Sequence, residues 1–192
     1  MPALHKMKNI VLIGMPGVGK STVGVVVAKR MGCRFVDADL VIQETYGKLL
    51  HELIEEHGVD GFLELENRVN ASLNVENTVI ATGGSVCYGR EAMAHLKQIG
   101  IVVYLKLGCE ALTERLGDLN ERGVALKAGQ TLETLYLERV PLYEAYADIT
   151  VDCEGKSLRE TAEEVCRCVR LFCETDGKRV SEAAASHSLP SE

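Results

Sequence analysis

The octapeptide GMPGVGKS, Gly14–Ser21, is the feature that most constrains how this chain of 192 residues can fold. It fits the pattern G-x-x-x-x-G-K-[ST], and it lies between the apolar run NIVLIG and a segment with helical spacing that begins at Lys20. A strand, a glycine-rich turn and a helix in this order bind phosphate, because the glycines let backbone N–H groups turn inward and the helix adds its positive end. The motif therefore predicts a nucleotide-binding α/β domain.

Individual residues of this loop have distinct tasks toward a nucleoside triphosphate. Lys20 supplies a positive charge for the β- and γ-phosphates, and the Ser21 hydroxyl is a ligand for Mg²⁺. A GTPase would also need an Asn-Lys-x-Asp segment, which the sequence lacks. We therefore expect ATP and Mg²⁺ as cofactors. The predicted nucleotide-binding residues of this segment are Gly14, Gly17, Val18, Gly19, Lys20, Ser21 and Thr22.

Strand-like and helix-like segments alternate along the rest of the chain. Short apolar runs that end in polar residues or glycine are expected strands, and segments with apolar residues three and four apart are expected helices. The five expected strands are NIVLIG, RFVDAD, NTVIATGG, IVVYLKL and DITVDC. This alternation predicts a three-layer, doubly wound parallel sheet of five strands, which binds ligands at the carboxyl ends of its strands.

We expect one domain over residues 1–174, with a mobile lid at about 118–130, where the sequence is polar and has little periodicity. Residues 175–192 have almost no apolar content and are expected to be a disordered tail. Pro141 lies inside an otherwise helical segment, so a kink or a break is expected there.

The composition excludes two classes of partner. The formal net charge is −7, whereas nucleic acids and anionic membranes are bound through basic patches. No apolar run approaches the roughly 20 residues of a membrane span. Seven cysteines, an odd number, and the lack of a secretory signal are typical of free thiols in a reducing cytosol. We expect a cytoplasmic monomer whose partner is a small-molecule substrate.

Asp37 and Asp39 directly follow the second expected strand, where their carboxylates should repel each other. They are either a turn with a helix N-cap, or a metal ligand beside a general base. The strand IVVYLKL ends without the acidic residue that usually holds the metal in motors and translocases, so Asp37 is the best-placed carboxylate for Mg²⁺. A short chain with arginines in a loop favours a small kinase whose lid closes over its acceptor and excludes water.

The segments GMPGVGKST, DAD, FLELE, ATGGS, NERG and ERVPLY occur in the order that is found in the shikimate kinase family, which this chain resembles over roughly residues 8–170. The resemblance implies a phosphotransferase that moves the γ-phosphate of ATP to a hydroxyl of a small polyhydroxy acid. Shikimate, an intermediate of aromatic amino acid biosynthesis, is the leading candidate. A kinase of the same fold for another acceptor, or a nucleotide-binding regulatory protein with little turnover, remains an alternative.

The resemblance also implies roles at the reacting groups. Asp37 would hold Mg²⁺ together with Ser21, mostly through water, and Asp39 would contact the acceptor hydroxyl and take its proton. In the lid, Arg122 would reach the transferring phosphate, while Arg115 would lie near the adenine. Asp39 could instead be only the N-cap of the helix that follows it.

On the acceptor side, the resemblance implies that backbone N–H groups of Gly83 and Gly84 approach the acceptor. The guanidinium of Arg139 would bind the acceptor carboxylate through both oxygens. The alternatives are a plain turn at the glycines and, for Arg139, a surface charge paired with Glu138 or Glu144. The expected apolar wall, which core packing would explain equally well, consists of Leu50, Ile54 and Phe62.

The chain departs from the family most clearly at Leu63. The family pattern Phe-Arg-x-x-Glu reads FLELE at residues 62–66, so the second guanidinium for the shikimate carboxylate is missing. Losing such a charged hydrogen bond costs on the order of 1.5–3 kcal/mol. The glutamate of the family pattern is present as Glu66, but the arginine that would pair with it is absent. Two milder departures are Ser85 in place of a third glycine, and Arg-Gly-Val at residues 122–124 in place of Arg-Pro-Leu.

Overall fold

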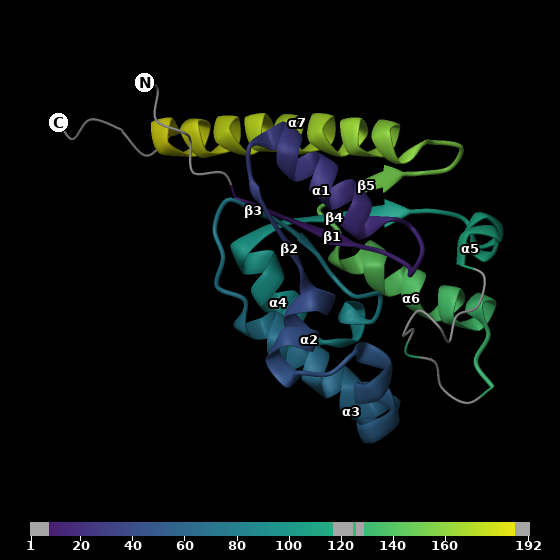
Figure 1. The fold of residues 1–192 in the computed structure, drawn as a ribbon. Coiled ribbons are helices and arrows are strands. Elements are labelled where there is room, and N and C mark those ends of the chain that lie inside the picture. The colour runs from purple at the N-terminus through teal and green to yellow at the C-terminus, as the bar shows by residue number, and fades with distance from the viewer. Residues whose placement is uncertain (1–7, 117–124, 126–128, 187–192) are drawn as a thin grey trace.

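The computed structural model describes residues 8–116, 125 and 129–186 of the protein, built around one parallel sheet (Figure 1). The strand order is β2-β3-β1-β4-β5, and every neighbouring pair is parallel. The strands are β1 (Asn9–Ile13), β2 (Arg34–Asp37), β3 (Thr78–Ala81), β4 (Gly100–Lys106) and β5 (Ile149–Asp152). All five expected strands are therefore confirmed.

Helices cover both faces of the sheet, which confirms the predicted three-layer, doubly wound arrangement. The helices are α1 (Lys20–Met31), α2 (Ala38–Tyr46), α3 (Leu50–Ser72), α4 (Arg90–Ile99), α5 (Cys109–Leu116), α6 (Leu132–Tyr146) and α7 (Leu158–Ser186), with a 3₁₀ turn η1 (Val86–Tyr88). α1 and α7 pack against each other on one face, and α3, α4 and α6 lie on the other (Figure 1). Within the described residues, none of these helices is long and apolar enough to cross a membrane.

The central strands form the core and align the ends at which ligands are expected. The apolar side chains of β1 are fully buried, as expected for a parallel strand that helices cover on both faces. Leu12 lies opposite Ala81 of β3, which in turn lies opposite Asp37 of β2. The segments that follow these three strands therefore leave the same edge of the sheet. They are the phosphate loop, the turn at Gly83 and the start of α2.

Pro141 does not break α6, so of the kink or break expected there, the break is wrong. The helix runs from Leu132 to Tyr146 without interruption. Proline leaves the carbonyl four residues earlier without its helical hydrogen bond, and that carbonyl belongs to Leu137, whose side chain is exposed. Water can therefore replace the lost bond.

The C-terminus also differs from the expectation. α7 continues to Ser186, well past the residue 175 at which we expected order to end. Its last turns contain three consecutive alanines at 183–185, and alanine is the strongest helix former. The high helix propensity of these alanines can thus extend α7, which is already packed on α1. Residues 187–192 lie outside the described part of the chain.

Candidate active site

A cavity of about 640 Å³ opens at the carboxyl edge of the sheet, as the topology predicts. Its walls come from the phosphate loop, α2, α3, the turn after β3, α5, α6 and the loop before α7. The predicted site residues that line it are Gly17, Gly19, Lys20, Ser21, Thr22, Asp39, Gly83, Gly84, Arg115 and Arg139, and the predicted wall residues are Leu50 and Phe62. The cavity thus joins the expected nucleotide and acceptor halves.

Some predicted residues do not line this cavity. Gly14 and Val18 are buried in the loop, and Asp37 and Ile54 are also absent from the cavity wall. Ile54 packs instead against a smaller apolar cluster between α2 and α3, which supports the core-packing interpretation for this residue. Arg122, together with most of the expected lid, lies outside the described residues.

The phosphate loop adopts backbone conformations that favour glycine. Gly17 and Gly19 have φ angles of 80° and 100°, in the region that side chains with a Cβ rarely occupy. A Cβ atom at Gly14 would lie 2.6 Å from the carbonyl oxygen of Leu105. The loop therefore passes close to β4 before it leads into α1, whose first-turn N–H groups are available to an anion.

The Lys20 ammonium group folds back over this loop. Its Nζ donates hydrogen bonds to the carbonyl oxygens of Gly14, at 2.7 Å, and Met15, at 3.0 Å. Burial lowers the pKa of Lys20 to about 8, although the carboxylates of Asp39 and Asp37 oppose this shift. A phosphate bound in the loop would favour the charged lysine, so the two would stabilise each other.

The structure separates the roles of the two crowded aspartates. Asp37 ends β2 and is the N-cap of α2, because its Oδ1 accepts a hydrogen bond from the Asp39 backbone N–H at 3.0 Å. Asp39 lies in the first turn of α2 and lines the cavity. The alternative in which Asp39 is the cap is therefore wrong. Burial raises the pKa of Asp39 to about 6, and the Asp37 carboxylate adds to the rise, so Asp39 is a stronger proton acceptor than an ordinary aspartate.

The oxygen atoms near the loop fit a magnesium ion. The exposed Ser21 hydroxyl lines the cavity, and Asp37 belongs to the adjoining edge of the sheet. Mg²⁺ keeps several waters and needs only one or two protein oxygens beside the phosphates. Because Asp37 caps a helix and does not line the cavity, its carboxylate suits contact through water rather than direct ligation.

The glycine turn after β3 brings the acceptor half together. A Cβ atom at Gly83 would lie 2.2 Å from Oε1 of Glu66 and 2.8 Å from Oδ1 of Asp39. At Gly84 it would lie 2.8 Å from the Pro16 ring and 3.1 Å from Nη1 of Arg139. No side chain fits at either position without displacing these groups. The two glycines therefore allow the backbone to approach two carboxylates and a guanidinium.

Arg139 is held inside the protein, not at its surface. It is 1% exposed, and its Nε and Nη2 donate hydrogen bonds to the Tyr88 hydroxyl, at 3.3 Å, and the Ala125 carbonyl, at 3.2 Å. Its guanidinium also lies over the Tyr88 ring. The alternative, pairing with Glu138 or Glu144, is wrong: Glu138 accepts a hydrogen bond from Tyr88, and Glu144 pairs with Lys106. Arg139 thus remains directed toward the cavity.

Glu66, on α3, is the one buried carboxylate among the described residues, with 1% exposure. It lines the cavity, and within the described residues neither carboxylate oxygen makes a hydrogen bond, although Ser85 lies nearby. Burial raises the pKa of Glu66 to about 7; nearby Ser85 offsets part of the rise, and Asp39 adds to it. In the sequence, Glu66 matches the glutamate of the family pattern. The sequence did not identify this carboxylate as part of the cavity wall.

This raised pKa predicts how Glu66→Gln changes stability with pH. Between its ordinary value of 4.5 and about 7, the native carboxyl holds a proton that the unfolded chain releases, so the native state loses stability as pH rises. We expect the ligand-free Glu66→Gln variant to melt at least about 2–4 °C above the wild type at pH 8. The difference should shrink at pH 5. Thermal unfolding at both pH values tests this, and an equal difference at both would contradict it.

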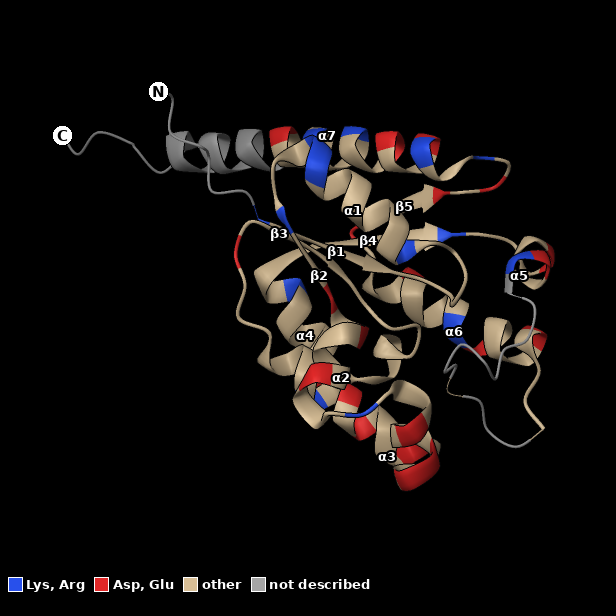
Figure 2. Ribbon diagram, viewed as in Figure 1, with Lys and Arg blue, Asp and Glu red and all other residues tan. Residues whose placement is uncertain are grey.

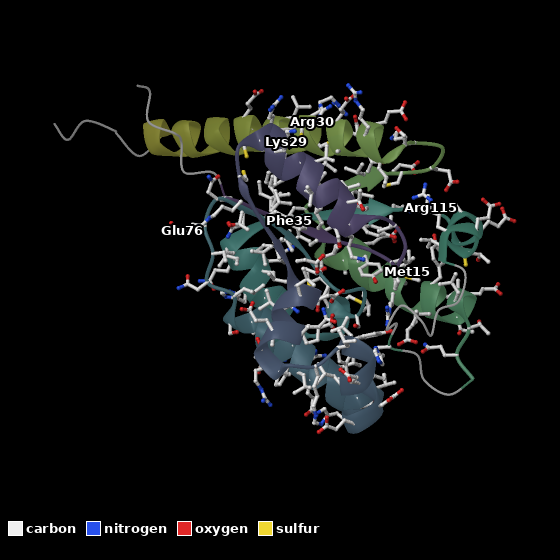
Figure 3. The ribbon with its side chains drawn as sticks, in the orientation of Figure 1. Met15, Lys29, Arg30, Phe35, Glu76 and Arg115 are labelled. Atoms are coloured by element: carbon white, nitrogen blue, oxygen red, sulfur yellow. The ribbon has the colours of Figure 1, made fainter. Side chains whose placement is uncertain are left out.

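Two pairs of residues that help to form the site were not predicted from the sequence. Lys156 and Ser157 line the cavity from the loop that follows β5. Arg115, which is labelled in Figure 3, lines it from α5. The position of Lys156 and Ser157 after a strand end was the available signal. Tyr88 and Tyr143, which hold Arg139 and the Gly84 carbonyl, carry no such signal, because their contacts join distant segments.

Comparisons with known proteins agree with this geometry. The family model described as shikimate kinase matches residues 16–170. The shikimate kinase of Persephonella marina is 36% identical over 165 residues, which cover 85% of this chain and 100% of that protein. The one from Geobacter sulfurreducens is 37% identical over 166 residues, covering 85% and 91%. The structure of shikimate kinase from Acinetobacter baumannii in complex with shikimate has a TM-score of 0.77 at 29% identity, covering 86% of this chain and 94% of that one.

Proposed function

Because this chain belongs to the shikimate kinase family, we propose that it transfers the γ-phosphate of ATP to a hydroxyl of a small polyhydroxy acid. Shikimate is the leading candidate, since the similar Acinetobacter baumannii structure is a complex with shikimate. The observation that carries the proposal is that the phosphate loop, Asp39 and Arg139 line one cavity. A nucleotide site and an acceptor site in one cavity are what direct phosphoryl transfer needs.

Each described group has a defined task in this proposal. The loop and Lys20 bind the phosphates, and Asp39 orients the acceptor hydroxyl and takes its proton. Ser21 and Asp37 hold Mg²⁺, which neutralises charge on the phosphates when it is bound. Arg139 binds the acceptor carboxylate, Gly83 and Gly84 let the backbone approach the acceptor, and Arg115 lies beside the nucleotide base. We also propose that Arg122 contacts the phosphate that is being transferred.

The proposal extends to the organisation of the chain. Residues 1–174 form the kinase domain, and about 118–130 close over the substrates as a lid. The protein acts as a cytoplasmic monomer. A nucleotide-binding regulatory protein is disfavoured, because binding alone would not need a carboxylate and a guanidinium, Asp39 and Arg139, in the same cavity.

An acceptor panel tests the proposed function. ADP release from Mg·ATP is measured with shikimate, quinate and simple polyols. Saturable release with shikimate supports the leading candidate, and release with another acceptor only supports the kinase of different specificity. Tight ATP binding without acceptor-dependent release would contradict the proposal and favour a regulatory protein.

A further inference from the structure

When Glu66 is ionised, the described residues of the acceptor half carry more negative than positive charge. Asp39 and Glu66 both line this half, and Arg139 is the one guanidinium that faces them among the described residues. Lys20 lies on the phosphate loop, where the nucleotide phosphates would engage it. An acceptor with one carboxylate and no cation would add a further negative charge to this excess.

The buried carboxylate forms no hydrogen bond with any of the described residues. Removing a carboxylate from water without a hydrogen bond or a cation is costly, and both oxygens of Glu66 lack a described partner. Leu63, one helical turn before Glu66 on α3, is half-buried and apolar. Side chains at these two positions are neighbours, so a cation from position 63 could have met Glu66, whereas leucine cannot.

The three charged groups surround a space that fits a small molecule. The carboxylate oxygens of Glu66 and Asp39 lie beside Gly83, and the Arg139 guanidinium lies beside Gly84; the Cα atoms of adjacent residues are about 3.8 Å apart. A ligand of a few carbon atoms can therefore contact all three. The helix that carries Glu66 also presents acidic residues along much of its length (Figure 2), but Glu66 is the one among them that lines the cavity.

We propose that this chain also phosphorylates a hydroxylated amino acid, whose ammonium group pairs with Glu66 and takes the place of the guanidinium that is missing at position 63. Its carboxylate binds Arg139, and its hydroxyl lies at Asp39. This inference rests on the proposed function and adds a second class of acceptor, hydroxy acids that also carry an ammonium group. The raised pKa of Glu66 agrees with it, because burial disfavours the ionised carboxyl and the cation of a bound ligand would favour it.

The reaction is otherwise the one already proposed. The acceptor hydroxyl oxygen forms a bond to the γ-phosphorus of ATP, and the bond between that phosphorus and the β–γ bridging oxygen breaks. Asp39 takes the hydroxyl proton, and ADP leaves. The ammonium group stays protonated throughout, so it contributes to binding and not to the transfer.

Pairs of acceptors that differ only in the ammonium group test the inference. With the full chain and Mg·ATP, ADP release is measured for L-serine against glycerate, and for L-homoserine against 2,4-dihydroxybutyrate, with shikimate alongside. In each pair a hydroxyl replaces the ammonium at nearly constant size. We expect at least about a tenfold higher kcat/KM for the amino member in one pair, the effect of a charged hydrogen bond.

Two variants link this preference to Glu66. Leu63→Arg supplies a guanidinium from the protein, and Glu66→Gln removes the negative charge, so both should reduce the preference to within about threefold of unity. Leu171→Arg is the matched control, because it makes the same substitution at an exposed position on α7, outside the cavity wall. This control should keep the wild-type preference. Binding of Mg·ATP to each variant checks that the nucleotide half is intact.

The possible outcomes are distinct. Turnover of shikimate or another hydroxy acid without turnover of either amino acid, or an ammonium preference that survives in Leu63→Arg, overturns this inference and leaves the proposed function standing. ATP binding without turnover of any acceptor contradicts the proposed function, and the inference falls with it.

Discussion

Asp39→Asn is expected to reduce kcat by roughly 10²- to 10⁴-fold, the range found when a positioned general base is removed. Asparagine keeps the size of the side chain but cannot accept the proton of the acceptor hydroxyl. The capping bond at the start of α2 should survive, because it is made by the Asp37 carboxylate and the backbone N–H of residue 39. The Kd for Mg·ATP should therefore change little, and steady-state kinetics together with ATP titration measure both quantities.

A matched control separates this effect from a general loss of charge. Asp152→Asn makes the same substitution at the exposed end of β5, outside the cavity wall. The asparagine oxygen can still accept the hydrogen bond that the Glu154 backbone donates, so this variant should keep wild-type turnover. An Asp39→Asn enzyme with a near wild-type rate would show that Asp39 does not act as the base.

Leu63→Arg is expected to lower the KM for shikimate by about ten- to a hundredfold, the effect of one charged hydrogen bond of 1.5–3 kcal/mol. The new guanidinium would lie one helical turn from Glu66, where it could pair with that carboxylate and bind the acceptor carboxylate together with Arg139. Turnover at saturating shikimate should change much less, because the contact exists before and during transfer. Initial-rate kinetics with shikimate give both parameters.

A double-mutant cycle with Glu66→Gln tests whether the two side chains act together. If the arginine works beside Glu66, the gain in shikimate affinity from Leu63→Arg should depend on whether residue 66 is Glu or Gln. Independent, additive effects would show that position 63 acts elsewhere. An unchanged KM in the single variant would contradict the account of the missing contact.

Local patterns in the sequence predict most of the fold. The strands and the phosphate loop are short-range features, since β-rich runs, glycines and one lysine at fixed spacing specify them. Parallel topology then places Asp39 and Gly83 at one edge of the sheet without any knowledge of side-chain packing. Of the kink or break expected at Pro141, the break does not occur, and Leu137, whose carbonyl loses its helical hydrogen bond, is exposed.

The rest of the site depends on contacts between segments that are distant in sequence. Tyr88 and Arg139 are 51 residues apart, and their contact decides that the arginine is a cavity residue and not a surface charge. The assignment of the cap to Asp37 rests on one backbone hydrogen bond. That Glu66 is buried without a hydrogen bond to any described residue follows only from the folded structure, because its neighbours come from distant segments.

The most direct test of the central claim is to identify the product by ³¹P NMR after the protein is incubated with Mg·ATP and shikimate. The account predicts a new phosphate monoester resonance that grows in step with ADP and is absent with a Lys20→Ala variant. ATP that stays unchanged, or that yields only inorganic phosphate, with shikimate and with every other hydroxylated acceptor tested, would contradict it.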